Sequence, residues 1–217
     1  MKHRRGNGAT MPTALLALSG SPNASSKTSL ALQHLVDHAA STEASLDTGS
    51  MEYGVTAKLL RLGDLAMQFC DGREPSLYTG DSRLVIDHVV AADALVLGTP
   101  IYRGAYTGLL KNLLDMLPND ALRGKPVGLV ATGGSDHHYL ALEHELKPVV
   151  GFFDAYVVPG SVYLSNRHYR DGALVDSEAL ESLHRLADSV LACATRVPRE
   201  LLGGAGLSIR RRSLSQS

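Results

Sequence analysis

Short apolar runs alternate with segments of helical periodicity along most of this chain. The runs are apolar without interruption, which is typical of strands buried on both faces of a parallel sheet. The segments between them space apolar residues three and four positions apart, as at Leu110, Leu113 and Leu117, and so predict amphipathic helices. Five strands separated by helices predict an α/β fold with a doubly wound, five-stranded parallel sheet. The predicted strands are 13–18, 55–60, 94–97, 127–131 and 155–163, the last interrupted at Pro159 and Gly160.

The length and charge of the chain limit the number of domains and the kinds of partner that it can have. At 217 residues it can form one domain with a full core, and we expect a folded domain at 13–196, a flexible arm at 1–12 and a disordered tail at 197–217. The formal net charge of −1 favours neither a nucleic-acid nor a membrane partner, and no apolar stretch is long enough to span a bilayer. Two isolated thiols, Cys70 and Cys193, predict a cytoplasmic location without a disulfide framework.

Three predicted strands end in loops that contain more chemistry than a turn needs. These loops are 19–28, 98–108 and 132–138. Because the carboxyl ends of parallel strands meet at one edge of a sheet, where open α/β sheets bind ligands, we expect the three loops to converge. A plain connector is the alternative for the second loop, but two tyrosines and an arginine there have no function in a turn.

The first loop has the composition of an anion site. It combines hydroxyl groups and a lysine with the backbone N–H groups of a helix start, which attract negative charge. Ser26 stands where a triphosphate-binding loop requires its second glycine, and the dinucleotide pattern G-x-G-x-x-G is absent. These departures favour a single terminal phosphate, with a capped helix and no ligand as the alternative. The candidate ligands are Ser19, Ser21, Ser25, Ser26, Lys27 and Thr28.

The second and third loops suit a flat ring. Pro100, Ile101 and Tyr102 offer backbone groups, and Tyr102 or Tyr106 offers an aromatic face. Gly133 and Gly134 let the backbone approach the other edge of such a ring closely. A phosphate site joined to a ring site describes a mononucleotide, and the two ring-binding loops favour FMN.

Several motifs together resemble the NADPH-dependent FMN reductase family, and most closely its reductase components of two-component alkanesulfonate and methanesulfonate monooxygenase systems. The resemblance covers about residues 13–196, and the order and spacing of the motifs carry it. The motifs are Gly20-Ser-Pro with a Ser-rich turn, Gly98-Thr-Pro-Ile-Tyr, Tyr106-Thr-Gly, Leu110-Lys-Asn-Leu-Leu-Asp, Ala131-Thr-Gly-Gly and Leu146-Lys-Pro.

This resemblance implies a flavodoxin-like fold with strand order 2-1-3-4-5 and an FMN site. It also implies an enzyme that transfers hydride from NADPH or NADH to FMN, forms a homodimer or homotetramer, and supplies reduced flavin to a partner monooxygenase. Hydride transfer between stacked rings needs alignment more than an acid–base pair, so no catalytic side chain is assigned.

Residue roles also follow from the resemblance. Ser21, Ser26, Lys27 and Thr28 would hold the phosphate, although many members have an arginine in this loop. The ring would lie against Pro100, Ile101, Tyr102 and Arg103, with Thr132, Gly133 and Gly134 at its far edge. His144 would occupy an inserted position near the flavin at the subunit interface, and such an insertion predicts a local π-bulge.

Other functions remain as alternatives. A reductase of quinones, azo dyes or metal oxyanions that keeps its FMN would share this fold, as would a flavodoxin-type electron carrier. A carrier usually has an acidic docking surface, and this chain is near neutral. The histidines show no metal-ligand spacing with acids, and the adjacent Ser135, Asp136 and His137 do not predict a hydrolase triad.

Overall fold

The computed structural model describes residues 12–41 and 54–202. Most of the predicted N-terminal arm, and the part of the predicted tail from residue 203 onward, lie outside these described residues. Among the helices of the described residues, none has the length and apolar character that crossing a membrane requires.

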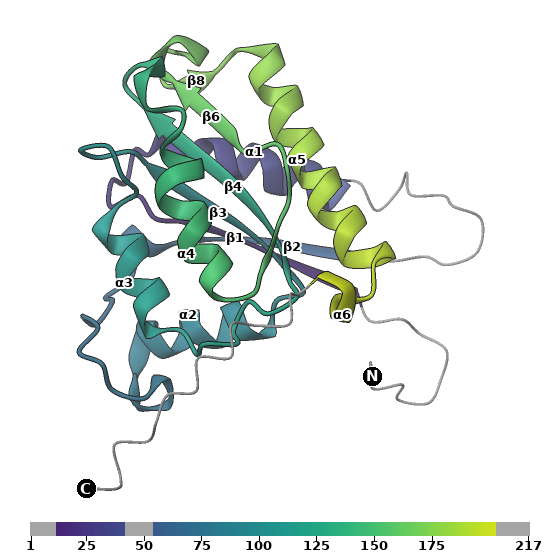
Figure 1. The fold of residues 1–217 in the computed structure, drawn as a ribbon. Helices are drawn as coiled ribbons and strands as arrows, with labels where there is room; N and C mark the ends of the chain where they lie inside the picture. Colours follow the sequence, from purple (N-terminus) through teal and green to yellow (C-terminus); the bar gives the residue numbers. More distant parts are fainter. Residues whose placement is uncertain (1–11, 42–53, 203–217) are drawn as a thin grey trace, which may run out of the picture.

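A parallel sheet forms the centre of the fold, and its strand order is β2-β1-β3-β4-β5 (Figure 1). The prediction of a flavodoxin-like α/β sheet is therefore confirmed. The predicted final strand is split in two by Pro159 and Gly160, and both halves pair with β4. The strands are β1 (Thr13–Ser19), β2 (Val55–Arg61), β3 (Ala94–Pro100), β4 (Pro126–Gly133), β5 (Tyr156–Val157) and β6 (Val162–Ser165).

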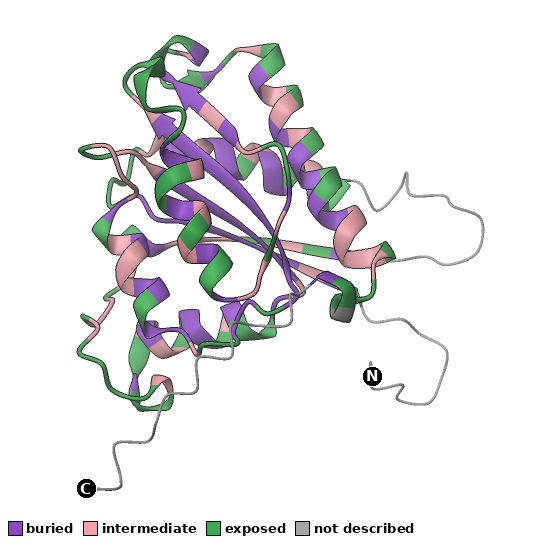
Figure 2. Cartoon of the chain, viewed as in Figure 1, coloured by how far each residue is buried: buried purple, intermediate pink, exposed green. Residues whose placement is uncertain are grey.

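Helices cover both faces of this sheet. One face packs against α1 (Lys27–Ser41) and α5 (Ser177–Arg196), and the other against α2 (Gly80–Ala91), α3 (Gly108–Met116) and α4 (Lys147–Phe152) (Figure 1). Alternate residues of β1 belong to the two resulting core clusters, which explains why its sequence is apolar without a break. Figure 2 shows the central strands as the most continuously buried part of the chain.

The polar stretch after β6 has structure that the sequence analysis does not predict. A short 3₁₀ turn, η6 (Asn166–His168), leads into the hairpin β7 (Tyr169–Arg170) and β8 (Ala173–Leu174). Asp171 and Gly172 form its two-residue turn with φ values of 50° and 80°. An Asp-Gly pair is a strong signal for such a hairpin, so the sequence did contain this information.

The start of the predicted tail contains a short helix. After Pro198 the chain forms α6 (Arg199–Leu202), where Leu202 is buried. The guanidinium Nε of Arg199 donates a hydrogen bond of 3.0 Å to the carbonyl of Arg123, and the Arg199 carbonyl oxygen would lie only 2.5 Å from a Cβ at Gly124. These contacts attach the start of the tail to the turn that precedes β4.

Candidate functional site

The three predicted loops meet at the carboxyl edge of the sheet, where they enclose a cavity of about 270 Å³. All the predicted cofactor-binding residues line it except Ser19 and Arg103, as does the candidate ligand Ser25, and Asn23 and Asn166 also contribute. The lining residues are Ser21, Asn23, Ser25, Ser26, Lys27, Thr28, Pro100, Ile101, Tyr102, Thr132, Gly133, Gly134 and Asn166.

Backbone contacts fasten the first loop to the second. The Gly20 N–H donates to the carbonyl of Gly98 at 2.8 Å, and the hydroxyl of Thr107 donates to the Gly20 carbonyl at 2.6 Å. A Cβ at Gly20 would lie 2.7 Å from the Cβ of Leu110, so α3 can approach the loop only because glycine is there. Thr107 is also the N-cap of α3, since its side chain accepts from the Leu110 N–H. One buried hydroxyl thus joins the loop to the helix.

The first turn of α1 presents polar groups to the cavity. Ser26 caps this turn by accepting a hydrogen bond of 3.1 Å from the Ser29 N–H. Ser21 and Asn23 accept from backbone N–H groups within the loop, which order it before any ligand binds. Backbone N–H groups at such a helix start favour an anion.

Ser19 takes no part in this arrangement. It is the last residue of β1, and its side chain points to the α1 face of the sheet, on the same side as Ala17. The residue is fully buried, and its hydroxyl is 2.8 Å from that of Ser29. Ser19 is therefore not among the residues that line the cavity.

The second loop begins with a tight turn. Tyr102 and Ala105 exchange backbone hydrogen bonds around Arg103 and Gly104, whose φ values of 53° and 87° are left-handed. This turn places Arg103 at an exposed tip outside the cavity, while Tyr102 lines the cavity and remains half exposed. The Ile101 N–H donates to the Thr132 carbonyl at 2.8 Å and ties the second loop to the third.

The third loop is held from both sides. The hydroxyls of Thr28 and Thr132 are 2.6 Å apart, so the start of α1 and the end of β4 are joined inside the cavity wall. On the other side, the Tyr163 hydroxyl donates to the Ser135 carbonyl at 2.7 Å. A Cβ at Gly133 would lie only 1.9 Å from that hydroxyl oxygen, so this arrangement requires glycine at position 133.

Comparison with known proteins identifies the family. The family described as NADPH-dependent FMN reductase matches residues 13–169. The chain belongs to this FMN reductase family. It is 34% identical to the NADH-dependent FMN reductase SfnF of Pseudomonas putida, over 82% of this chain and 91% of that one. It is 47% identical to an NAD(P)H-dependent FAD/FMN reductase of Geobacillus thermodenitrificans, over 63% of this chain and 75% of the other.

Other members and solved structures agree with the fold. An oxidoreductase from Corynebacterium diphtheriae superposes with a TM-score of 0.71 at 22% identity, covering 85% of this chain and 98% of that chain. The apo NADH:FMN oxidoreductase EmoB superposes with a TM-score of 0.63 at 29% identity, covering 82% and 89%. An FMN-dependent NADPH-azoreductase of Staphylococcus haemolyticus is 35% identical over 54% of this chain and 64% of its own length.

The predicted π-bulge is present in this FMN reductase family member. Residues Leu142–Leu146 form a π-helical segment, η5, that continues into α4, and the Lys147 N–H bonds to the carbonyl of Leu142. His144 lies in the middle of η5 and is exposed, outside the cavity.

Tyr106 is also outside the cavity lining and packs partly on the core, and this burial raises its pKa. Pro148 lies at the start of α4, directly after η5.

Asn166 was not among the predicted site residues. It follows β6, another strand that ends at this edge, and its side-chain oxygen accepts a hydrogen bond of 2.7 Å from the Lys27 ammonium. A polar residue directly after a predicted strand was the available signal. Asn23 lies within the first loop that was predicted, but it was not among the predicted ligands, whereas Ser25 was.

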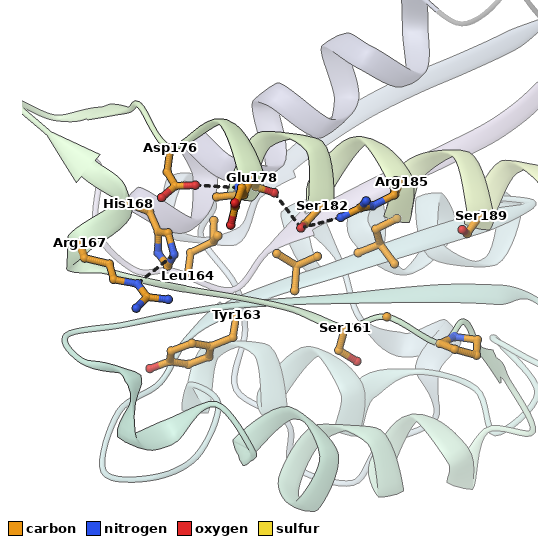
Figure 3. Close-up of a pocket in the computed structure, with 15 residues that line it drawn as sticks. Ser161, Tyr163, Leu164, Arg167, His168, Asp176, Glu178, Ser182, Arg185 and Ser189 are labelled. Carbon is orange, nitrogen blue, oxygen red and sulfur yellow. Dashed lines mark hydrogen bonds between the residues drawn. The ribbon is translucent and has the colours of Figure 1, made fainter.

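A second, larger hollow lies elsewhere on this FMN reductase family member. Its volume is about 840 Å³, and it runs along β6 and one face of α5 (Figure 3). Both of its arginines are engaged with neighbours: Arg185 pairs with Glu181, and Arg167 pairs with Asp136. Asp176 caps α5. None of the three strand-end loops lines it, so we place the functional site in the smaller cavity.

Proposed function

We propose that this chain uses NAD(P)H to reduce FMN in the smaller cavity. The observation that carries the proposal is the division of this cavity into two chemically different ends. One end is a helix start with several hydroxyls and an ammonium group, which suits a phosphate. The other is a glycine-rich edge facing Tyr102 and Ile101, which suits a flat aromatic ring. These residues therefore fit FMN, and membership of the FMN reductase family supports the same cofactor.

Each part of the lining has a role in this proposal. Ser21, Ser26, Lys27 and Thr28 hold the phosphate with Ser25 and Asn166 beside them. Pro100, Ile101 and Tyr102 lie along one side of the ring. Thr132, Gly133 and Gly134 lie along its far edge, at a distance that the Tyr163–Ser135 hydrogen bond sets. Arg103 receives no role, because it is exposed at the tip of its turn and is not among the lining residues.

The chemistry of the lining agrees with hydride transfer. When bound, FMN accepts a hydride from a reduced nicotinamide. The only side chains among the lining residues that can titrate are Lys27 and Tyr102, and no carboxylate, histidine or thiol is among them. The lining thus offers alignment and positive charge without an acid–base pair, as stacked-ring hydride transfer requires. Asp136 is paired with Arg167 at 3.1 Å, so Ser135 and His137 lack the third member of a triad.

We further propose that this chain self-associates and supplies reduced flavin to a monooxygenase. Exposed apolar side chains surround the π-helical segment: Tyr139 and Leu140 precede it, and Phe152 ends α4. A second copy packed on this face would bury them as a homodimer or homotetramer. The SfnF and SfnE names of relatives from Pseudomonas putida support a flavin-supplying role.

Steady-state kinetics with free FMN as the varied substrate tests the main proposal. Saturable oxidation of NADPH or NADH that depends on added FMN is the expected result. If the purified protein retains its flavin and reduces an azo dye or quinone much faster than free FMN, the azoreductase-like alternative is correct. If it oxidises no reduced nicotinamide with either acceptor, the proposal is wrong and an electron carrier is favoured.

A further inference from the structure

We propose that Asn166 positions the Lys27 ammonium so that the cavity selects flavins ending in a phosphate over flavins ending in a hydroxyl. This inference rests on the proposed function. It assigns a specificity role to the η6 turn, a segment that follows β6 and lies outside the three loops that the sequence predicted.

The geometry holds Lys27 from two sides. Its Nζ donates to the Asn166 Oδ1 at 2.7 Å and lies 5.1 Å from the centre of the Tyr169 ring. The Tyr169 hydroxyl donates to the Lys27 carbonyl at 3.1 Å, so the same tyrosine contacts both the ammonium and the backbone of Lys27. A lysine side chain is otherwise flexible, and these contacts restrict its ammonium to the cavity wall. Two of its three N–H donors remain for a ligand.

Lys27 has no carboxylate partner among the residues that the structure describes. Within residues 12–41 and 54–202, its ammonium has a neutral amide as its hydrogen-bond acceptor and forms no salt bridge with a carboxylate. Asp136 belongs to the third loop next to the cavity, and Arg167 pairs with it at 3.1 Å. Two consecutive residues of η6 therefore have different roles. Asn166 orients the Lys27 ammonium without neutralising it, and Arg167 neutralises Asp136.

This arrangement has a consequence for specificity. A monophosphate carries close to two negative charges at neutral pH and accepts charge-assisted hydrogen bonds, whereas the terminal hydroxyl of riboflavin is uncharged. Loss of one charge-assisted contact corresponds to roughly a tenfold change in Kd. Asn166 should thus affect the Kd for FMN and leave the Kd for riboflavin nearly unchanged.

Flavin-fluorescence titrations of the full chain with FMN and with riboflavin test this inference. We expect Asn166→Ala to weaken FMN binding by about tenfold and riboflavin binding by less than about twofold. Asn166→Asp is the decisive variant, because its carboxylate preserves the shape of the side chain and strengthens the contact to Lys27. It neutralises the ammonium and repels phosphate, so FMN binding should weaken more than in Asn166→Ala. Lys27→Met should remove most of the preference for FMN.

Matched controls separate this role from general effects. Asn119→Ala changes an exposed asparagine in the turn after α3, and Lys58→Met removes an exposed charge on β2; neither residue lines the cavity. Both should keep the wild-type ratio of the two Kd values. The inference is overturned if Asn166→Asp binds FMN as tightly as wild type, or if Asn166→Ala weakens both flavins equally. If wild type binds neither flavin, the proposed function itself fails.

Discussion

At the scale of single residues, Lys125 is a buried cation at the end of the sheet opposite the cavity. It is 1% exposed, and its ammonium donates to the carbonyls of Val89 and Val90, each at 2.8 Å. These carbonyls belong to the last turn of α2, where a cation interacts favourably with the helix dipole. Burial, and secondarily the charge of Arg199, lowers the pKa of Lys125 to about 8.

This pKa shift predicts a pH dependence of stability. The unfolded chain keeps the Lys125 proton up to the ordinary pKa of 10.5, so the folded protein loses it first as pH rises. The free energy of unfolding should therefore increase between about pH 8 and 10.5, by at most about 3 kcal/mol. Urea denaturation of wild type and Lys125→Met over this range measures the effect. Their difference should grow in favour of wild type, and a constant difference would contradict the prediction.

Gly133 and Tyr163 should behave as a coupled pair. Gly133→Ala places a methyl group where the Tyr163 hydroxyl lies, and such overpacking should cost about 1–3 kcal/mol of unfolding free energy. Adding Tyr163→Phe removes the atom at 1.9 Å and leaves a ring carbon at 2.9 Å, so it should recover part of the loss. Tyr163→Phe alone should destabilise, because it loses the bond to Ser135. Denaturation of both single variants and the double variant tests this, and additive losses would refute it.

At the scale of elements, the N-terminus of α3 and the first loop depend on one hydroxyl. Thr107→Val keeps the shape of the side chain but removes the N-cap and the donor to the Gly20 carbonyl. Because Thr107 is 3% exposed, water cannot replace these contacts, and the free energy of unfolding should fall by about 2 kcal/mol. Thr107→Ser keeps the hydroxyl and serves as the control. Thermal or urea denaturation should rank the valine variant well below the serine variant; equal stability would disprove the role.

At the scale of the whole molecule, the face around η5 and α4 should be a contact between copies of this chain. Phe152 is 55% exposed there, and a charge at this position would be buried unpaired in such an interface. Phe152→Glu should therefore shift the sedimentation coefficient of the protein to that of a monomer. Val175→Glu, at a 49% exposed position before α5, is the matched control and should sediment as wild type does. A monomeric wild type would rule out the interface.

Much of the fold and the site could be predicted without the structure. Strands buried on both faces must be continuously apolar, which made β1, β3 and β4 recognisable. Since parallel strands end at one edge, the loops after them had to meet. Two of the assigned residues do not line the cavity. The alternation of side chains along β1 turns Ser19 toward α1, and Arg103 lies at the exposed tip of a tight turn.

The amino-acid sequence by itself determined the sheet, its layers and the three loops, because burial and turn chemistry are encoded by neighbouring residues. Only the tertiary structure decided which distant side chains meet. Pairing of β6 with β4 brings Asn166 to Lys27, 139 residues away along the chain, and sets Tyr163 against Gly133. No local pattern carries such contacts, since they depend on the register of a strand that pairs through backbone groups common to all residues.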